Sequence, residues 1–206
     1  MSRDQPEDGR RARRNASREK VVAAFLALVR AGVREPGAHA IAHKAGVSPR
    51  TVFRCFEDME ALYRELTAAV RQEFMPRARL DLNTPDRAER LERLLKNRIA
   101  MFADMEPFVF ASERYRHRYP SVADDSAFIV RSERDRLTLV MNPDGAVDAD
   151  HFEALHAAAS FDHWRRLRVD QGLSKARAGR VMSAAARAIL AAAPDPGPVK
   201  DDGAVR

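Results

Sequence analysis

Apolar residues recur at spacings of three and four positions along most of this sequence, which is the pattern of amphipathic helices. The first stripe predicts a helix from Asn15 to Ala31, with Asn15 or Ser17 as its N-cap and Gly32 at its end. Its apolar members are Val21, Val22, Phe25, Leu28 and Val29. No segment alternates apolar and polar positions between turn signals as a strand should, so we expect an all-α fold.

Two short helices are predicted next, over residues 38–45 and 49–56, and Gly46 ends the first of them. Ser48 is a good N-cap for the second helix. Pro49 suits the first helical position, because the N–H that proline lacks would be unpaired there anyway. The turn between the two helices is therefore short and well defined.

The second short helix divides into an apolar and a polar face. Val52 and Phe56 are expected to face inward, whereas Arg50, Thr51 and Arg54 cannot all do so. Two short helices joined by a tight turn have the spacing of a helix-turn-helix. The major groove of DNA accepts one helix, and arginine can bind O6 and N7 of guanine together. Arg50 and Arg54 lie one helical turn apart, so both are predicted to point toward the same ligand.

Six further helices are predicted in the rest of the chain, which makes nine in all. Proline, glycine and capping residues mark their ends, and Asn142-Pro143-Asp144-Gly145 is a strong turn. The predicted helices run from Asp58 to Phe74, from Thr84 to Phe102, from Pro107 to Tyr115, from beyond Pro120 to Met141, from Asp148 or Asp150 to Leu167, and from Ser174 to a stop before Pro194.

The two ends of the chain differ from the middle in composition. Residues 1–14 are polar and rich in arginine, so we expect a flexible basic arm there, and residues 194–206 have the composition of a disordered tail. The arm is either a DNA contact or a solvated tail. Between these ends we place a helix-turn-helix domain at 15–57 and a larger helical domain at 58–193.

The charge balance favours an anionic partner. The 206 residues contain 36 Lys and Arg against 30 Asp and Glu, a formal net charge of +6. Basic side chains displace counterions condensed on phosphates, although a membrane surface attracts the same charge. The apolar stretch Val21–Val29 is too short to span a bilayer, and no secretory leader is recognisable. We therefore expect a soluble cytoplasmic protein without a membrane partner.

From Arg18 to Val70 the sequence resembles the tetracycline-repressor (TetR) family of bacterial transcriptional regulators. The matching runs are REKVVAAFLALVRAG and IAHKAGVSPRTVFRCFEDMEAL. The resemblance implies a recognition helix at Ser48–Phe56, a homodimer, a palindromic operator in double-stranded DNA, and a C-terminal domain that binds a small-molecule effector. Carried over by position, the DNA-binding residues would be Ser48, Pro49, Arg50, Thr51, Phe53 and Arg54, with Lys44 and His39 from the preceding helix.

Three positions depart from the pattern of that family. Relatives often have Tyr where this chain has Phe53, His or Tyr where it has Cys55, and Lys where it has Met59. Phe53 lacks a hydroxyl that would reach a phosphate, and Met59 lacks a charge. These departures leave an alternative open, namely a helical ligand-binding or protein-interaction module that has lost operator binding.

Aromatic and methionine side chains of the larger domain can line a ligand cavity or simply fill the core. Small residues at 157–159 and 184–188 let helices approach closely, which suits either a dimer interface or packing within one chain. The candidate ligand-binding residues are Met101, Phe102, Met105, Phe108, Phe110, Tyr115, Phe128 and Trp164.

Other chemistries find little support in the sequence. His39 and His43 are four residues apart, but a surface or phosphate role fits them better than a metal, and the remaining histidines lack the spacing of a zinc site. No phosphate loop, nucleophile elbow or paired-carboxylate motif is present, so we expect neither an enzyme nor a cofactor. Cys55 is either a core residue or a redox-sensitive thiol.

Overall fold

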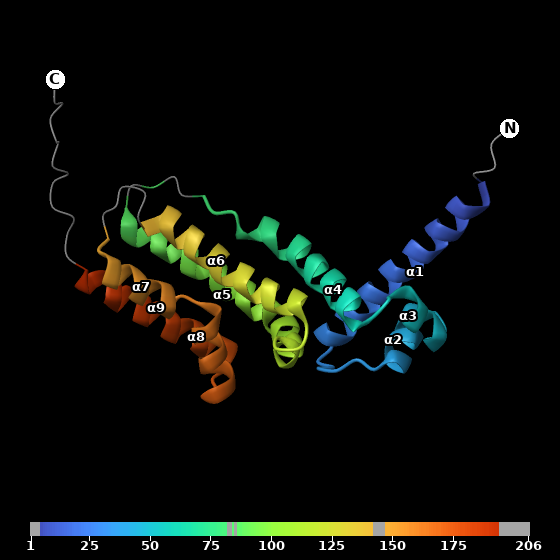
Figure 1. Cartoon of the computed structure of the whole chain (residues 1–206). Helices are drawn as coiled ribbons and strands as arrows, with labels where there is room; N and C mark the ends of the chain where they lie inside the picture. Colours follow the sequence, from blue (N-terminus) through green and yellow to red (C-terminus); the bar gives the residue numbers. More distant parts are fainter. Residues whose placement is uncertain (1–4, 82–83, 85, 142–146, 194–206) are drawn as a thin grey trace, which may run out of the picture. The chain divides into compact units, whose positions relative to one another are not determined.

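The computed structural model describes residues 5–81, 84, 86–141 and 147–193, with side chains from Arg11 onward. These residues form nine α-helices and no strand, so the predicted all-α fold is confirmed (Figure 1). The predicted turn at Asn142–Gly145 and the predicted tail at 194–206 lie outside the described residues. The helices are α1 (Gln5–Arg30), α2 (Ala38–Ala45), α3 (Pro49–Cys55), α4 (Met59–Phe74), α5 (Arg87–Ser112), α6 (Pro120–Met141), α7 (Ala149–Ala158), α8 (Phe161–Arg165) and α9 (Lys175–Ala192).

The chain divides into two compact units. Unit 1 comprises Met1–Arg77 and Asp104–Phe128, and unit 2 comprises Ala78–Ala103 and Ile129–Arg206. Helices α5 and α6 therefore contribute residues to both units. Unit 1 is larger than the helix-turn-helix domain that we predicted at 15–57, because it also takes in α4 and parts of α5 and α6.

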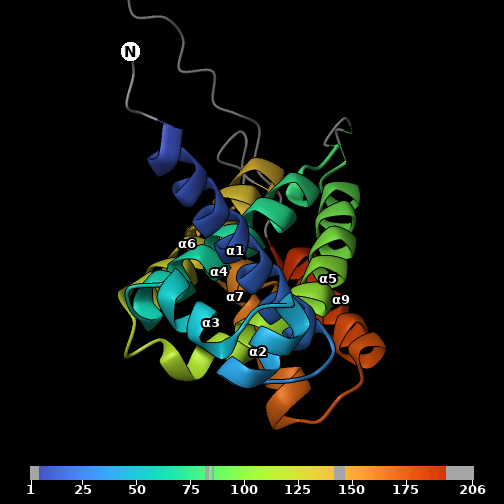
Figure 2. The same cartoon turned by 90° about the vertical axis from the view of Figure 1, so that its right-hand side faces the viewer.

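In unit 1 the first four helices pack together. Helix α1 contacts α2, α3 and α4, and Figures 1 and 2 both show α2 and α3 beside its C-terminal half. The apolar face of α1 is buried as its spacing predicts, and Gly32 takes a φ of 92° just after the helix. Arg18 pairs with Glu65 and Arg30 with Glu73, which ties α1 to α4 at two points along its length.

Helix α1 begins ten residues earlier than predicted, at Gln5 rather than near Asn15. The part of the expected arm at residues 1–14 that the structure describes, from Gln5 onward, is therefore helical. Pro6 sits in the first turn, where proline is tolerated, and the following residues are mainly helix formers. Ser17, a predicted N-cap, lies inside the helix and its hydroxyl donates to Arg13 O at 2.9 Å.

Unit 2 has a continuous apolar core. Leucines of α5 and α6 meet apolar side chains of α7 and α9, and Asp148 and Ser174 cap the N-termini of α7 and α9 with hydrogen bonds to backbone N–H groups. The buried members of this core are Leu91, Leu94, Leu95, Leu137, Val140, Met141, Val147, Phe152, Leu155, Ala159 and Ala186.

Pro107 lies inside α5. The prediction that a new helix begins at Pro107 is therefore wrong. A proline in a helix leaves the carbonyl four residues earlier without its N–H partner, which here is the carbonyl of Ala103. The ammonium group of Lys175 donates to Ala103 O at 2.6 Å. A side chain from α9 therefore supplies the hydrogen bond that the backbone of Pro107 cannot.

The helix predicted from Asp148 or Asp150 to Leu167 is broken between α7 and α8. At the break, Arg98 Nη1 donates to Ala159 O at 2.9 Å, and Phe161 N donates to Glu133 Oε1 at 3.0 Å. Arg98 and Glu133 are only 1% and 5% exposed. Burial raises the pKa of the Glu133 carboxyl to about 7 and lowers the pKa of Arg98 to about 10. This buried pair replaces the helical hydrogen bonds that the break gives up.

Candidate nucleic-acid interface

The turn between α2 and α3 has the geometry that the sequence predicts. Gly46 adopts the left-handed conformation, with φ 66° and ψ 35°, immediately after the last residue of α2. Val47 N donates back to Ala42 O at 3.0 Å, which closes the end of the helix. The chain can then reverse and begin α3 after only Gly46, Val47 and Ser48.

The start of α3 is fixed by its cap. Ser48 Oγ accepts a hydrogen bond from Thr51 N at 3.2 Å and lies 2.9 Å from the Thr51 hydroxyl oxygen. Pro49 occupies the first turn of the helix. The predicted N-cap role of Ser48 and the predicted place of Pro49 in the first turn are therefore confirmed. Asp58 Oδ1 likewise accepts from Ala61 N at 2.7 Å and caps α4.

The two faces of α3 are separated as the sequence predicts. Val52, Cys55 and Phe56 are buried toward the other helices of unit 1. Arg50 and Arg54 are exposed on the other face, and the Phe53 side chain is 70% exposed. Two guanidinium groups and an aromatic ring are thus presented by a short, capped helix, and arginine is one of the side chains that can bind base edges in a major groove.

The remaining candidates for DNA contact surround this face. Ser48 is exposed, whereas Pro49 and Thr51 are half-buried. His39 and Lys44 are exposed on α2, whose buried side is formed by Ile41 and Ala42. Every candidate for DNA contact therefore has solvent-accessible atoms in unit 1.

A basic groove runs between α1 and α3. It has a volume of about 730 Å³, and half of the eight residues that line it are basic. None of the eight is acidic, so the groove favours an anionic polymer such as a phosphate backbone. The lining residues are Arg13, Arg14, Ala16, Ser17, Lys20, Thr51, Arg54 and Cys55.

The sequence contained an unused signal for this groove. Arg13, Ser17 and Lys20 follow one another at spacings of four and three residues, which places them on one face of a helix. We missed Lys20 because the predicted helix started at Asn15 and left the arginines in a flexible arm. Cys55 also borders the groove, but only 2% of its surface is exposed, so the structure favours its packing role.

The candidate ligand-binding residues are divided between the two units. In unit 2, the Phe102 ring lies 5.3 Å from that of Phe161 and 6.3 Å from that of Trp164, and Met101 is also buried. Met105, Phe108, Phe110, Tyr115 and Phe128 belong to unit 1. The structure thus brings Phe102 and Trp164 together in a packed core.

The unit 1 members of that set have separate surroundings. Phe108 packs against Phe74, with ring centroids 6.1 Å apart. The guanidinium of Arg71 lies 3.9 Å above the Phe128 ring. Tyr115 lies 4.8 Å from the ring of Tyr63. A role for the set in ligand binding stays a prediction.

Metal-binding clusters and membrane-spanning helices are both absent from the described residues. No three His, Cys, Asp or Glu side chains gather there in a way that would hold a metal ion. Within the same residues, no helix combines the length and the apolar character needed to cross a bilayer.

The fold and this interface define an all-α protein in which a helix-turn-helix presents a basic face. No family profile matches the chain, and no curated protein sequence matches it. A crystal structure from Mesorhizobium loti, provisionally described as a TetR-family transcriptional regulator, is similar in fold. It superposes with a TM-score of 0.54 and 20% sequence identity, over 88% of this chain and 97% of the other. The two proteins therefore share their fold over 88% of this chain, which includes much more than the helix-turn-helix.

Proposed function

We propose that this protein is a DNA-binding transcriptional regulator of the cytoplasm, a repressor that binds a palindromic operator as a homodimer and is released by a small molecule. The observation that carries the proposal is the exposure of Arg50 and Arg54 on a capped helix beside a basic groove. The provisional description of the similar Mesorhizobium loti protein as a transcriptional regulator supports the same reading.

Each part of the interface has a distinct task in this proposal. Arg50 and Arg54 contact base edges in the major groove, where arginine binds guanine through two hydrogen bonds. Arg13, Arg14 and Lys20 contact phosphates, which supplies affinity without sequence preference. The protein has a binding role and no catalytic one.

Helix α9 supports a homodimer. One side of α9 buries Ala178, Met182 and Ala186 against its own chain. The other side exposes a second apolar stripe at helical spacing, which comprises Val181, Ala184, Ala188 and Ala191. A second copy of the chain would cover this stripe through close approach of two helices, and twofold symmetry would repeat the recognition helix on a palindrome.

The effector of this proposal is a small molecule that binds among aromatic and methionine side chains. Met101, Phe102, Met105, Phe108, Phe110, Tyr115, Phe128 and Trp164 remain the proposed lining of its site. For release, the effector must bind a dimer whose recognition helices no longer match successive major grooves, about 34–36 Å apart, more tightly than the dimer that fits DNA.

The proposal is tested by selecting operators from random duplexes with the full-length chain. The selected duplex is then titrated by fluorescence anisotropy with the protein and with Arg50→Ala and Arg54→Ala. We expect each substitution that removes a base contact to cost about 1–3 kcal/mol of binding free energy. Arg131→Ala, an exposed arginine on α6, is the matched control and should bind as the parent does.

The alternative, a helical ligand-binding or protein-interaction module without operator binding, gives a different result. Selection would then return no preferred sequence, and any residual DNA binding would change as much in Arg131→Ala as in Arg50→Ala. The departures at Phe53, Cys55 and Met59 from the pattern of the TetR family motivate this alternative, and the Phe53 ring is 70% exposed. A sequence-specific complex that weakens only in the α3 variants would eliminate it.

A further inference from the structure

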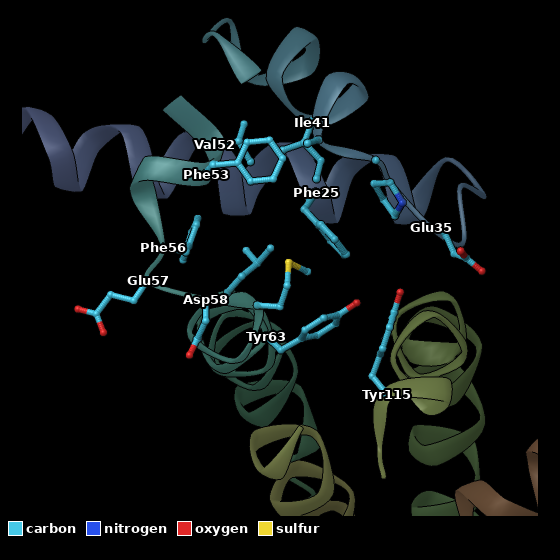
Figure 3. Close-up of a pocket in the computed structure, with 15 residues that line it drawn as sticks. Phe25, Glu35, Ile41, Val52, Phe53, Phe56, Glu57, Asp58, Tyr63 and Tyr115 are labelled. Carbon is cyan, nitrogen blue, oxygen red and sulfur yellow. The ribbon is translucent and has the colours of Figure 1, made fainter. Parts of the chain in front are cut away.

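A second concave site lies in unit 1, on the side of α3 away from the basic groove. The pocket has a volume of about 500 Å³, within the range of small-molecule sites. Aromatic rings from four segments of the chain form much of its wall (Figure 3). These rings belong to Phe25, Phe53, Phe56, Tyr63 and Tyr115.

The polar part of this pocket is acidic. Its lining includes the carboxylates of Glu35, Glu57 and Asp58 and contains no lysine or arginine. Glu35 is paired with Arg114, so its charge is balanced. Glu57 and Asp58 are exposed at the edge, and Asp58 is held there by its hydrogen bond from Ala61 N. Two carboxylates therefore face solvent beside a ring-lined hollow.

One of the rings already accepts a cation. The guanidinium of Arg114 lies 4.7 Å above the ring of Tyr115. The faces of aromatic rings attract cations through their quadrupole, and aromatic cages bind quaternary ammonium groups in this way. Aromatic walls and nearby carboxylates together select a ligand that is both apolar and positively charged.

We propose that this pocket binds a small apolar cation, of the class of quaternary ammonium compounds with an aromatic substituent. The ligand's hydrocarbon lies against Phe25, Phe56 and Tyr63, and its charge lies at the rim beside Glu57 and Asp58, whose carboxylates are turned outward from the rings (Figure 3). The two hollows that border α3 thus have opposite charge preferences, because the groove shared with α1 is lined by Arg13, Arg14, Lys20 and Arg54.

A ligand in the pocket would contact two residues of α3. Phe53 belongs both to the pocket wall and to the exposed face of the helix, and Val52 lines the pocket from the same helix. A ligand there contacts the recognition helix itself and competes with DNA for Phe53. This coupling rests on the proposed function, whereas the binding of the cation does not.

Calorimetry with the full-length protein tests the site. The probe is benzyltrimethylammonium, and benzenesulfonate is the anionic control of similar size. We expect the cation to bind with one-to-one stoichiometry and the anion to bind more weakly. The net charge of +6 attracts anions to the chain as a whole, so a preference for the cation requires a local acidic site. Absence of binding at millimolar cation, or tighter binding of benzenesulfonate, would overturn the proposal.

Two variants locate the binding. Glu57→Gln combined with Asp58→Asn removes both charges, and asparagine still caps α4. We expect the affinity for the cation to fall roughly threefold to tenfold. Tyr115→Leu removes one ring and should lower it by a similar factor. Glu19→Gln, a carboxylate exposed on α1, is the matched control and should change nothing. If the parent, Glu57→Gln/Asp58→Asn and Tyr115→Leu all bind the cation with equal affinity, the cation binds elsewhere and the site is refuted.

The coupling to DNA is measured separately. Benzyltrimethylammonium is added to a complex of the protein with its selected duplex, and the anisotropy is followed. We expect the cation to weaken the parent complex and to have less effect on the complex of Glu57→Gln/Asp58→Asn. If the protein selects no duplex, the proposed function fails while the calorimetric result still decides the site. If the duplex binds equally with the pocket filled, the coupling is refuted.

Discussion

Gly179 of α9 lies directly against Ile99 of α5, so closely that a Cβ at residue 179 would come within 2.9 Å of Ile99 Cγ2. The Cγ2 methyl is fixed to the branched Cβ of isoleucine and cannot swing away as the end of a long side chain would. Neighbouring α9 residues on the buried side are also small, with Ala178 and Ala186 fully buried. The absence of a side chain at 179 therefore sets how near α9 comes to α5.

Gly179→Ala is expected to destabilise the protein, although alanine is the better helix former by about 1 kcal/mol. The new methyl overlaps Ile99, and overpacking of this kind costs about 1–3 kcal/mol, so the net loss is on the order of 1 kcal/mol. Urea unfolding followed by circular dichroism measures it. In an Ile99→Ala background the same substitution should be neutral or stabilising. A parent chain stabilised by Gly179→Ala would show that the contact with Ile99 is loose.

The Glu133 carboxyl is expected to make stability depend on pH. Burial raises its folded pKa to about 7 from the ordinary 4.5, so the folded state holds a proton that the unfolded chain releases. Its contribution is complete below about pH 4.5 and is lost as the pH rises through 7. Relative to Glu133→Gln, whose amide oxygen still accepts from Phe161 N, the parent should lose roughly 1–3 kcal/mol of unfolding free energy between pH 5 and 8.

Glu92 provides the control for that experiment. Its pKa is lowered, chiefly by the side-chain hydrogen bond from Arg187, so its contribution is lost as the pH falls and not as it rises. In Glu92→Gln the free energy of unfolding should therefore fall between pH 5 and 8 as much as it does in the parent. Parallel curves for the parent and Glu133→Gln over that range would show that Glu133 does not titrate there.

Lys20 is expected to contribute to the salt dependence of DNA binding. It lines the groove between α1 and α3 and offers its ammonium group to a phosphate. Lys20→Ala should weaken binding to all duplexes alike and reduce the slope of log affinity against log salt concentration by about 0.9. Anisotropy titrations over a salt series measure the slope. Lys96→Ala, which removes an exposed lysine from α5, should leave it unchanged. Loss of sequence preference in Lys20→Ala would contradict a phosphate contact.

Val181→Arg is expected to separate the proposed dimer. Val181 is 36% exposed and is the first residue of the second apolar stripe of α9, and a buried guanidinium without a partner would destabilise a helix-to-helix contact there by several kcal/mol. Native mass spectrometry over a concentration series distinguishes monomer from dimer. Val33→Arg makes the same change at an exposed valine of unit 1 and should preserve the dimer. A dimer that survives Val181→Arg would place the interface on another face.

Local sequence was sufficient where a single side chain decides the structure. Ser48, Asp58 and Ser174 each cap the helix that follows, as their types and positions predict. Gly46 takes the left-handed conformation that ends α2. Helix α3 and its exposed face were predictable because the caps Ser48 and Asp58 leave few choices for the nine residues between them.

Local sequence was insufficient where distant residues decide. Nothing near Ser160 shows that the Phe161 amide would bond to Glu133, so the break between α7 and α8 was missed. Two errors cancelled in the count of nine helices, because the helix predicted at Pro107 merged into α5 while another divided in two. Arg98 gave one hint, since it stands within an apolar stripe between Leu94 and Phe102.

The hydrogen bond from Lys175 to Ala103 links two positions that are far apart in the sequence. As long as residue 107 is proline, a donor at 175 completes the backbone of α5. A chain with any other amino acid at 107 would regain its own N–H, and residue 175 would be free to change. Across related sequences, proline at the first position and lysine at the second should therefore be gained and lost together.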